Sequence, residues 1–428
     1  MKKRCRVLFA VVLVLAIALS TFVVAGAEEK TRITILRPGD ETKVRNFIEP
    51  AIAQFEAENP DIDVEIIYDS WGGWIATYPS QFQAGTQPDV IYWWDKAMLD
   101  TYANGKILPI EQYVDPAVFN DIPEAVIEMV KINDVLYHVP VDMYGQIMYY
   151  RKDVFEQAGL DPNAPPTTWE ELLECCKQIA EKTDVYPLAV PGKAGLESCH
   201  EFIAQFISQK TGQPLLDENN QITFNNELGK EALTFVTELL AYCDPSVTEY
   251  ARGDMRQLFK TGDVAIVLGD GVWAVPEYQA TFGKDLDNTI CGIALPPTTD
   301  AGAFNWCGLD GWAIAQDANA EAAGRLITFL CQPEVQFQHH TIFGGMPYTA
   351  YEAEQEATSY SFWNTFKKSI FEMTPVQRIG KYHPAPSAFY NVLEPIWQEM
   401  LLGNLTVDET LEQVADGVAE INARYGIE

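Results

Sequence analysis

The sequence predicts an α/β protein made of two blocks, and three observations carry this prediction. Strand and helix signals alternate along most of the chain, as in proteins whose parallel sheets are covered by helices. The length of 428 residues suits two or three domains. A content of 47% hydrophobic and 21% charged residues is typical of a soluble globular protein with a sizeable core. No internal repeat and no low-complexity linker interrupts the alternation.

The first block follows the pattern β-α-β-α-β. Strands are expected at Ile33–Leu36, Val64–Tyr68 and Asp89–Trp93, and helices at Lys43–Glu58 and Trp74–Ala84. Strands joined through helices lie parallel in one sheet. The carboxyl ends of such strands meet at one edge of the sheet, where proteins of this class bind ligands.

A second α/β block begins near residue 136. It opens with two extended segments, Leu136–Asp142 and Gly145–Arg151, with little turn signal between them. A capping box at Thr168–Glu171 then starts a helix. The remaining expected elements are strands at 186–190, 264–268 and 311–315, and helices at 201–209, 226–242, 252–260, 318–331, 388–402 and 407–423. Two blocks without a linker suggest two lobes joined by strands that cross between them.

The N-terminal 27 residues are predicted to be a secretory signal peptide that is cleaved after Ala27. Four basic residues precede the apolar run Val7–Leu19, and Ala25-Gly26-Ala27 forms a small-x-small cleavage site. The alternative is an uncleaved membrane anchor, because residues 7–27 are mostly apolar. No cysteine follows the apolar run, so the lipid-anchor pattern is absent. The expected location is therefore the periplasm or the extracellular space.

The charge and the cysteines restrict the partners of the mature chain. Cleavage would remove four basic and no acidic residues, changing the net charge from −32 to −36. Such a chain repels nucleic acids and anionic membranes, so no nucleic-acid partner is expected. Seven of the eight cysteines lie after the signal peptide, an odd number, which leaves at least one without an intrachain partner. Cys291 and Cys307 are the pair that could form a disulfide.

Catalytic and metal-binding patterns are largely missing. The sequence contains no H-E-x-x-H, G-x-S-x-G or G-x-x-x-x-G-K-[ST] motif. Gly269-x-Gly271 follows a strand, but Trp273 would crowd a dinucleotide pyrophosphate. The five histidines are scattered, and the adjacent His339 and His340 are expected to point in two directions, so no metal site is expected. No cofactor and no enzymatic activity are expected, although 61 acidic residues leave a secreted polysaccharide hydrolase as an alternative.

Tryptophans and acids gather where the predicted strands end. The stretch V-I-Y-W-W-D ends a strand with Trp93, Trp94 and Asp95. Neighbouring side chains of a strand point to opposite faces, so the two tryptophans cannot share one pocket. One of them is expected to pack in the core and the other to form the floor of a cleft beside Asp95. Purely structural loops more often contain Gly, Ser, Asn and Asp.

Several segments resemble one family when they are taken in order. P-D-V-I-Y-W-W-D-K begins a segment at 88–113 that resembles extracellular solute-binding proteins of the maltose-binding type, family 1 of ABC transporters. The segments 136–172, 259–273, 308–314 and 344–347 resemble later parts of the same family. Together they span most of residues 33–425. Tyr150-Arg151 departs from the Tyr-Asn that is usual in the family.

The resemblance implies a two-lobe periplasmic-binding-protein fold of type II. The ligand would lie in a cleft between the lobes, and the chain would cross between them three times. Lobe 1 would comprise about 31–141 plus 292–342, and lobe 2 about 142–291 plus 343–428. The implied function is capture of a solute outside the cytoplasm and its delivery, by a monomer, to the permease subunits of an ABC import system.

A carbohydrate is the favoured solute, and the many tryptophans favour an oligosaccharide. Aromatic rings cover the apolar face of a sugar, while carboxylates and Arg bind its hydroxyl groups. Trp273 is the strongest candidate, because it follows the strand-ending Gly269-Asp270-Gly271. By the resemblance, a tryptophan at this place stacks on the sugar. The candidate ligand-binding residues are Trp273, Asp310, Trp71, Trp94, Asp95, Asp142, Tyr144, Asp40, Glu41, Trp312 and Arg378. Rings beside acids also suit a polyamine or another cationic solute, which stays as an alternative, as does a chemoreceptor subunit that captures ligand.

Overall fold

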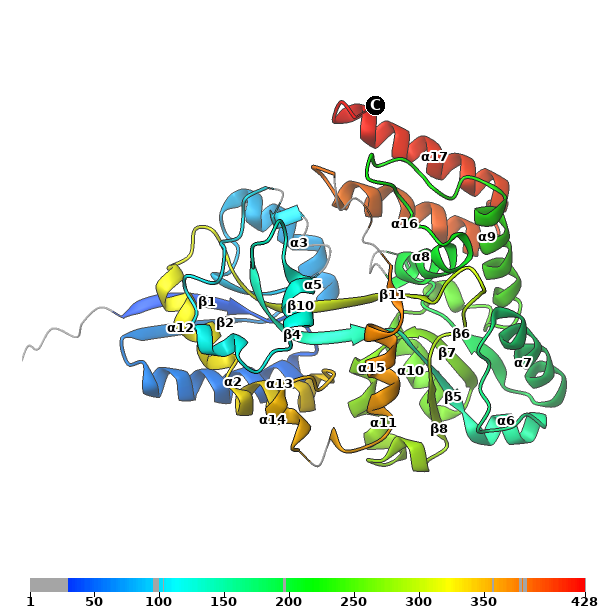
Figure 1. The fold of residues 1–428 in the computed structure, drawn as a ribbon, viewed down its shortest axis with the longest axis horizontal. Coiled ribbons are helices and arrows are strands. Elements are labelled where there is room, and N and C mark those ends of the chain that lie inside the picture. Colours follow the sequence, from blue (N-terminus) through cyan, green and yellow to red (C-terminus); the bar gives the residue numbers. More distant parts are fainter. Residues whose placement is uncertain are drawn as a thin grey trace, which may run out of the picture.

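The computed structural model of the chain describes residues 30–94, 100–102, 104–194, 198–355, 358–376, 379 and 383–427. Two lobes lie side by side along the long axis of the molecule, each around its own sheet (Figure 1). Among the described residues, no helix is long and apolar enough to span a membrane.

The first lobe contains a five-stranded sheet with the order β2-β1-β3-β10-β4. Its strands are β1 (Thr31–Leu36), β2 (Ile62–Ile67), β3 (Val90–Trp93), β4 (His138–Gly145) and β10 (Cys307–Ile314). β1 pairs in parallel with β2 and β3, which confirms the predicted parallel core of this block. β10 runs antiparallel between β3 and β4. The helices of this lobe are α2 (Glu41–Glu58), α3 (Trp71–Ala84), α5 (Glu124–Val130), α12 (Ala320–Leu330), α13 (Pro333–Phe343) and α14 (Ala350–Ala353).

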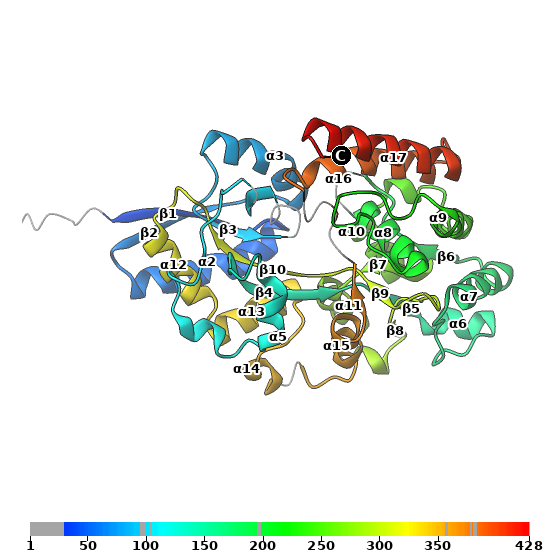
Figure 2. The ribbon, with the colours of Figure 1, turned by 45° about the horizontal axis from the view of Figure 1, so that its top comes forward.

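The second lobe contains a four-stranded sheet with the order β6-β7-β5-β8. Its strands are β5 (Ile147–Arg151), β6 (Tyr186–Ala189), β7 (Val264–Asp270) and β8 (Cys291–Ala294). Its helices are α6 (Lys152–Ala158), α7 (Trp169–Lys182), α8 (Ser198–Thr211), α9 (Glu227–Leu240), α10 (Arg252–Thr261), α11 (Val275–Phe282), α15 (Trp363–Phe371), α16 (Ser387–Leu401) and α17 (Val407–Arg424). This lobe also contains the short helices η2 (Val247–Glu249), η3 (Val272–Ala274) and η4 (Leu286–Asn288), whereas η1 (Pro116–Phe119) lies between β3 and α5 of the first lobe. The C-terminal α16 and α17 pack beside α8 and α9 (Figure 2).

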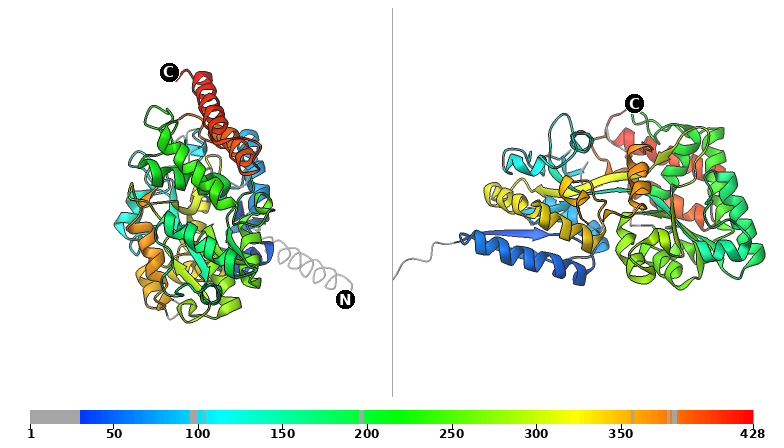
Figure 3. Two further views of the ribbon diagram at one scale, coloured as in Figure 1. Left: turned by 90° about the vertical axis from the view of Figure 1, so that its right-hand side faces the viewer. Right: turned by 60° about the horizontal axis from the view of Figure 1, so that its bottom comes forward.

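The chain crosses between the lobes at three places. β4 passes into β5 through Gln146 alone, and the segment from β8 to β10 returns. The third crossing runs from α14 to α15, and near it the short strands β9 (Phe304–Asn305) and β11 (Thr374–Pro375) pair in parallel. Figure 3 shows the lobes flanking these connections.

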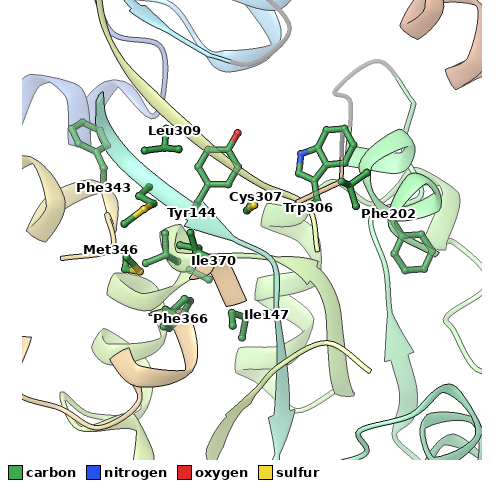
Figure 4. Packing of buried hydrophobic residues seen from close by; sticks show 14 of the residues in the cluster. Tyr144, Ile147, Phe202, Trp306, Cys307, Leu309, Phe343, Met346, Phe366 and Ile370 are labelled. Carbon is green, nitrogen blue, oxygen red and sulfur yellow. The ribbon is translucent and has the colours of Figure 1, made fainter. Parts of the chain in front are cut away.

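Apolar side chains continue from one lobe into the other. Tyr144 and Ile147 from the β4–β5 crossing lie close to Leu309 of β10 and to Phe366 of α15 (Figure 4). These residues belong to one buried cluster that includes both lobes. The junction is therefore packed core, which restricts the lobes to hinge-like motion rather than free rotation.

Three expectations need correction. The expected lobe boundaries precede the crossings, because β4 extends the first lobe to Gly145, β8 extends the second to Ala294, and α14 extends the first to Ala353. α3 begins at Trp71 rather than Trp74, because the Ser70 hydroxyl accepts a hydrogen bond from the Gly73 N–H at 3.0 Å and caps the helix. Trp71 is thus the first residue of a helix and not part of a loop. Cys291 and Cys307 form no disulfide, and all seven described cysteines are buried thiols.

Candidate functional site

A cavity of about 430 Å³ lies between the lobes, within the usual size range of small-molecule sites. One wall comes from the strand ends of the first sheet and the start of α3, and the other from α8, α10, η3 and α11. The lining residues are Arg37, Gly39, Asp40, Lys43, Trp71, Ile75, Tyr92, Trp94, Asp142, Tyr144, Glu201, Ala251, Arg252, Gly253, Arg256, Val272, Trp273, Glu277, Asp310, Phe343 and Gly344.

Two pairs of aromatic rings line the cavity. In the first lobe, Trp71 and Trp94 meet edge to face with ring centroids 5.6 Å apart. At the second lobe, Tyr144 from β4 and Trp273 from η3 meet in the same way at 5.0 Å. An edge-to-face contact fixes the relative orientation of two rings and covers a face of only one of them. The cavity therefore offers two pre-organised apolar surfaces.

Asp142 is the centre of a polar cluster in the first lobe. The Tyr92 hydroxyl donates a short hydrogen bond to its carboxylate, and the Arg37 guanidinium lies 3.8 Å away. Two imidazoles approach from α13, His339 Nδ1 at 3.5 Å and His340 Nε2 at 3.3 Å from Asp142 Oδ1. Burial alone would raise the pKa of Asp142. The two imidazoles outweigh burial and hold this pKa well below its usual range. Asp142 is therefore an ionised acceptor at the edge of the cavity.

Asp270 is the corresponding centre in the second lobe. It is fully buried and accepts two hydrogen bonds of 2.8 Å from the Arg256 guanidinium. It also accepts hydrogen bonds from the Gly271 N–H at 2.9 Å and from the Trp273 indole N–H. This carboxylate thus holds the ring of Trp273 against the cavity.

The cations that line the cavity are engaged by carboxylates. Arg252 pairs with Glu201 and also lies over the Trp273 ring, 5.2 Å from its centroid. Lys43 of the first lobe reaches Glu277 of the second at 3.5 Å, and Arg256 contacts the same carboxylate at 3.2 Å. Burial raises the pKa of Glu277, but these cations outweigh it and lower the pKa. The described lining therefore presents ion pairs rather than an unbalanced positive charge.

Most of the predicted ligand-binding side chains meet at this cavity, namely Asp40, Trp71, Trp94, Asp142, Tyr144, Trp273 and Asp310. Trp93 and Trp94 are both buried, but they occupy different places. Trp93 is fully buried and donates a hydrogen bond of 2.7 Å to Thr101 Oγ1, whereas Trp94 lines the cavity. The register explains the meeting of Asp142 and Asp310, because they face each other across the β4–β10 pair.

The other predicted residues lie elsewhere. Glu41 is exposed at the start of α2 and pairs with Arg45 at 2.7 Å, facing solvent. Trp312 is 1% exposed and packs edge-on against the ring of Tyr92, beneath the cavity wall. Asp95 and Arg378 lie outside the described residues.

Several lining residues were not among the candidates. Arg37 directly follows β1. Because ligands bind where parallel strands end, its position could have marked it as a candidate, as it did for Asp40. Tyr92 reads as ordinary strand core because its ring is buried and only its hydroxyl serves the site. Glu201, Arg252 and Arg256 come from helices of the second lobe, and the sequence carries no local signal that marks them.

The expectation that His339 and His340 diverge is wrong, since both approach Asp142. Ligand atoms of these three residues lie within 4.8 Å of one another, which is close enough for a metal ion. The donor set does not fit one. His339 Nε2 accepts a hydrogen bond from Arg37 Nε at 3.2 Å, and both His340 nitrogens contact oxygen acceptors. The nearby guanidinium would also repel a cation.

Comparisons with known proteins agree with this architecture. A binding protein of Brucella abortus (strain 2308) is 23% identical over 402 residues, covering 93% of this chain and 95% of its own. The sn-glycerol-3-phosphate-binding periplasmic protein of Rhizobium meliloti (strain 1021) is 26% identical over 340 residues, covering 71% and 73%. A solute-binding protein of an ABC transporter from Thermotoga lettingae, solved with α-D-tagatose, has a TM-score of 0.79 at 23% identity. It aligns with 92% of this chain and 100% of its own.

The family itself is shown by a sequence model. Residues 38–337, well over half of the chain, match the model of bacterial extracellular solute-binding proteins. The members of this family bind solutes and are not enzymes. The cavity between the two lobes of this chain is a place where a solute can be enclosed. The chain belongs to the family of bacterial extracellular solute-binding proteins.

Proposed function

We propose that the protein captures a neutral carbohydrate, an oligosaccharide, in the cavity between its lobes and delivers it to the permease of an ABC import system. The observation that carries this proposal is the pairing of two aromatic surfaces with fixed acceptors. Trp71 with Trp94, and Tyr144 with Trp273, give two places where the apolar face of a sugar ring fits. Asp142 lies in the same lining and accepts hydroxyl hydrogen bonds.

The charges favour a neutral ligand over a phosphate ester. A phosphate needs cations that are available to it, but Arg37, Arg252 and Arg256 each contact a carboxylate of this chain. A phosphate would have to displace these carboxylates and leave them buried without partners, which is costly. The same pairing disfavours a polyamine, because Asp142, Glu201 and Glu277 already face cations.

Export and assembly complete the proposal. Residues 1–27 direct the chain out of the cytoplasm and are removed after Ala27. The mature protein acts as a monomer, since one chain supplies both walls of the cavity.

Titration of the purified mature protein tests this function. The panel comprises D-mannitol, D-tagatose, maltose and maltotriose, together with sn-glycerol 3-phosphate and spermidine. Intrinsic tryptophan fluorescence reports binding, and calorimetry gives the stoichiometry. We expect saturable one-to-one binding of a neutral sugar, no product, and little change in affinity with ionic strength. Exclusive binding of the phosphate ester or of spermidine would contradict the proposal.

A pair of variants localises the binding. Trp273→Ala removes a ring of the lining, and Glu41→Gln changes an exposed residue at the start of α2 outside it. We expect the first to weaken sugar binding by about tenfold or more and the second to leave it unchanged. Equal affinities of the two variants would place the sugar elsewhere.

A further inference from the structure

We propose that Glu352, which does not line the cavity, is a positioning residue that fixes and charges the acceptor Asp142 through His340. Glu352 is fully buried in α14, on the far side of His340 from the cavity. Because Asp142 is an acceptor of the proposed ligand site, this role rests on the proposed function. No binding role of its own is required of Glu352.

The hydrogen bonds of His340 determine its protonation. Its Nδ1 contacts a carboxylate oxygen of Glu352. Its Nε2 lies 2.6 Å from the Val141 carbonyl oxygen and 3.3 Å from Asp142 Oδ1. Each of these oxygens is a hydrogen-bond acceptor, so a neutral imidazole would direct a lone pair at the Glu352 carboxylate or at the Val141 carbonyl. His340 therefore carries both protons and is a cation. Burial lowers the pKa of His340, but Glu352 and Asp142 outweigh it and raise the pKa to about 10.

The helix cap of α14 fixes Glu352. One of its oxygens, Oε2, accepts hydrogen bonds from the Tyr348 N–H at 3.1 Å and from the Thr349 N–H at 3.2 Å and hydroxyl at 3.0 Å. This is the capping box of α14, which leaves Oε1 for His340. Burial raises the pKa of Glu352, but His340 and these hydrogen bonds lower it below its usual value. A carboxylate that the backbone holds in this way is a rigid support.

The other groups around Asp142 do not replace His340. His339 Nε2 accepts from Arg37, so His339 is neutral and offers only its Nδ1 proton. The Arg37 guanidinium lies 3.8 Å from Asp142, and the Tyr92 hydroxyl donates to it. His340 is thus the cation nearer to Asp142 among these described groups. Glu352, His340 and Asp142 form a relay of three charged groups. Because α14 directly precedes the third crossing, this relay also connects the acceptor to a segment that joins the lobes.

Glu352→Gln removes the negative charge of this side chain and keeps its shape. The amide oxygen of glutamine can keep the three cap hydrogen bonds, while its NH₂ group donates to His340 Nδ1 and leaves the imidazole neutral. Glu354→Gln is the matched control, because Glu354 ends the same helix and is exposed. Thermal unfolding shows whether each variant is folded.

The first readout needs no ligand. In ¹⁵N-histidine NMR spectra of the wild type, His340 should stay doubly protonated up to pH 9. In Glu352→Gln it should lose a proton well below pH 9, and the ¹³C resonance of the Asp142 carboxyl should titrate at higher pH than in the wild type. A neutral His340 at pH 8 in the wild type overturns the proposal without any variant. Unchanged titrations in Glu352→Gln overturn it as well.

The second readout is affinity for the tightest-binding neutral sugar of the panel. We expect Glu352→Gln to weaken binding about tenfold and Glu354→Gln to have no effect. Altered titrations with unchanged affinity would overturn the positioning role. If no neutral sugar binds the wild type, the proposed function is wrong, and the titrations of His340 and Asp142 alone decide whether the relay exists.

Discussion

The two walls of the cleft hold their carboxylates by different means. In the first lobe, Asp142 faces two histidines and Arg37, and it is partly open to the cavity. In the second lobe, Asp270 is fully buried and is bound through two hydrogen bonds by Arg256. A guanidinium stays charged at any pH that a protein survives, whereas an imidazole titrates. The carboxylate of the second wall therefore keeps a charged partner at every such pH, whereas the partners of Asp142 include imidazoles that can titrate.

The walls also differ in what they do with the carboxylate. Asp270 does not line the cavity, and it serves the ligand only by holding the indole of Trp273. Asp142 lines the cavity and can contact a ligand itself. The second wall is thus a rigid support for a ring, and the first is a hydrogen-bonding surface.

The largest expected effect follows from breaking the second wall. Among the described residues, Asp270→Asn leaves the buried guanidinium of Arg256 with Glu277 as its remaining carboxylate partner. We expect the free energy of unfolding to fall by about 3–5 kcal/mol, because removal of one partner leaves a buried charge poorly compensated. Urea unfolding measures this. Asp416→Asn, at an exposed position of α17, is the control and should change stability by less than about 0.5 kcal/mol. A loss of under about 1 kcal/mol in Asp270→Asn would show that the charge of Arg256 does not depend on Asp270 for its compensation.

The next effect separates a core ring from a cavity-lining ring within the first wall. Trp93→Ala should lower the free energy of unfolding by about 3–5 kcal/mol, because the ring is fully buried, while the folded variant keeps its sugar affinity. Trp94→Ala should weaken sugar binding by about tenfold or more, since this ring lines the cavity. Urea unfolding and fluorescence titration of both variants make the comparison. Equal losses of stability with no loss of affinity would show that neither ring serves the ligand.

The sequence revealed the first wall far better than the second, for a topological reason. Parallel strands bring their carboxyl ends to one edge, so Asp40 and Trp94 could be assigned to a site from strand order alone. The register that places Asp142 opposite Asp310 follows from the crossing strands. Glu201 and Arg252 come from separate helices, and the packing of α8 and of α10 against β7 brings them together. Glu41 and Trp312 were misplaced because a neighbour in sequence can face solvent or core.

The pH dependence of stability should come from the first lobe. Burial lowers the pKa of both His138 and His339 to about 4, although Asp142 opposes this at His339. The unfolded chain binds protons at these histidines from about pH 6.5 downward, so stability is lost as the pH falls from 6.5 to 4. The expected loss is on the order of 3 kcal/mol per histidine. Urea unfolding at pH 7, 5.5 and 4.5 measures it.

A variant assigns this acid sensitivity to its source. His138→Asn removes one of the two groups, and because His138 packs against the ring of Trp93, the assignment compares slopes and not absolute stabilities. Between pH 6.5 and 4, the free energy of unfolding of the variant should fall by about half as much as that of the wild type. An unchanged slope would mean that the acid response arises elsewhere, for example from carboxylates, whose stabilising effect is also lost as the pH falls.

The smallest effect concerns the contact between the walls. Lys43 of α2 reaches Glu277 of α11 at 3.5 Å, and both side chains are partly exposed, at 37% and 26%. Solvent screens such a pair, so it should contribute less than about 1 kcal/mol. The pair spans the two lobes and exists only when they approach, so Lys43→Gln should weaken sugar affinity by about two- to fivefold with little change in stability. Calorimetric titration at 20 mM and 500 mM salt measures this, and the difference between variant and wild type should vanish at high salt. A difference that persists at high salt would mean that Lys43 contacts the sugar directly, and the two walls would then share the ligand's hydrogen bonds more evenly than their carboxylates suggest.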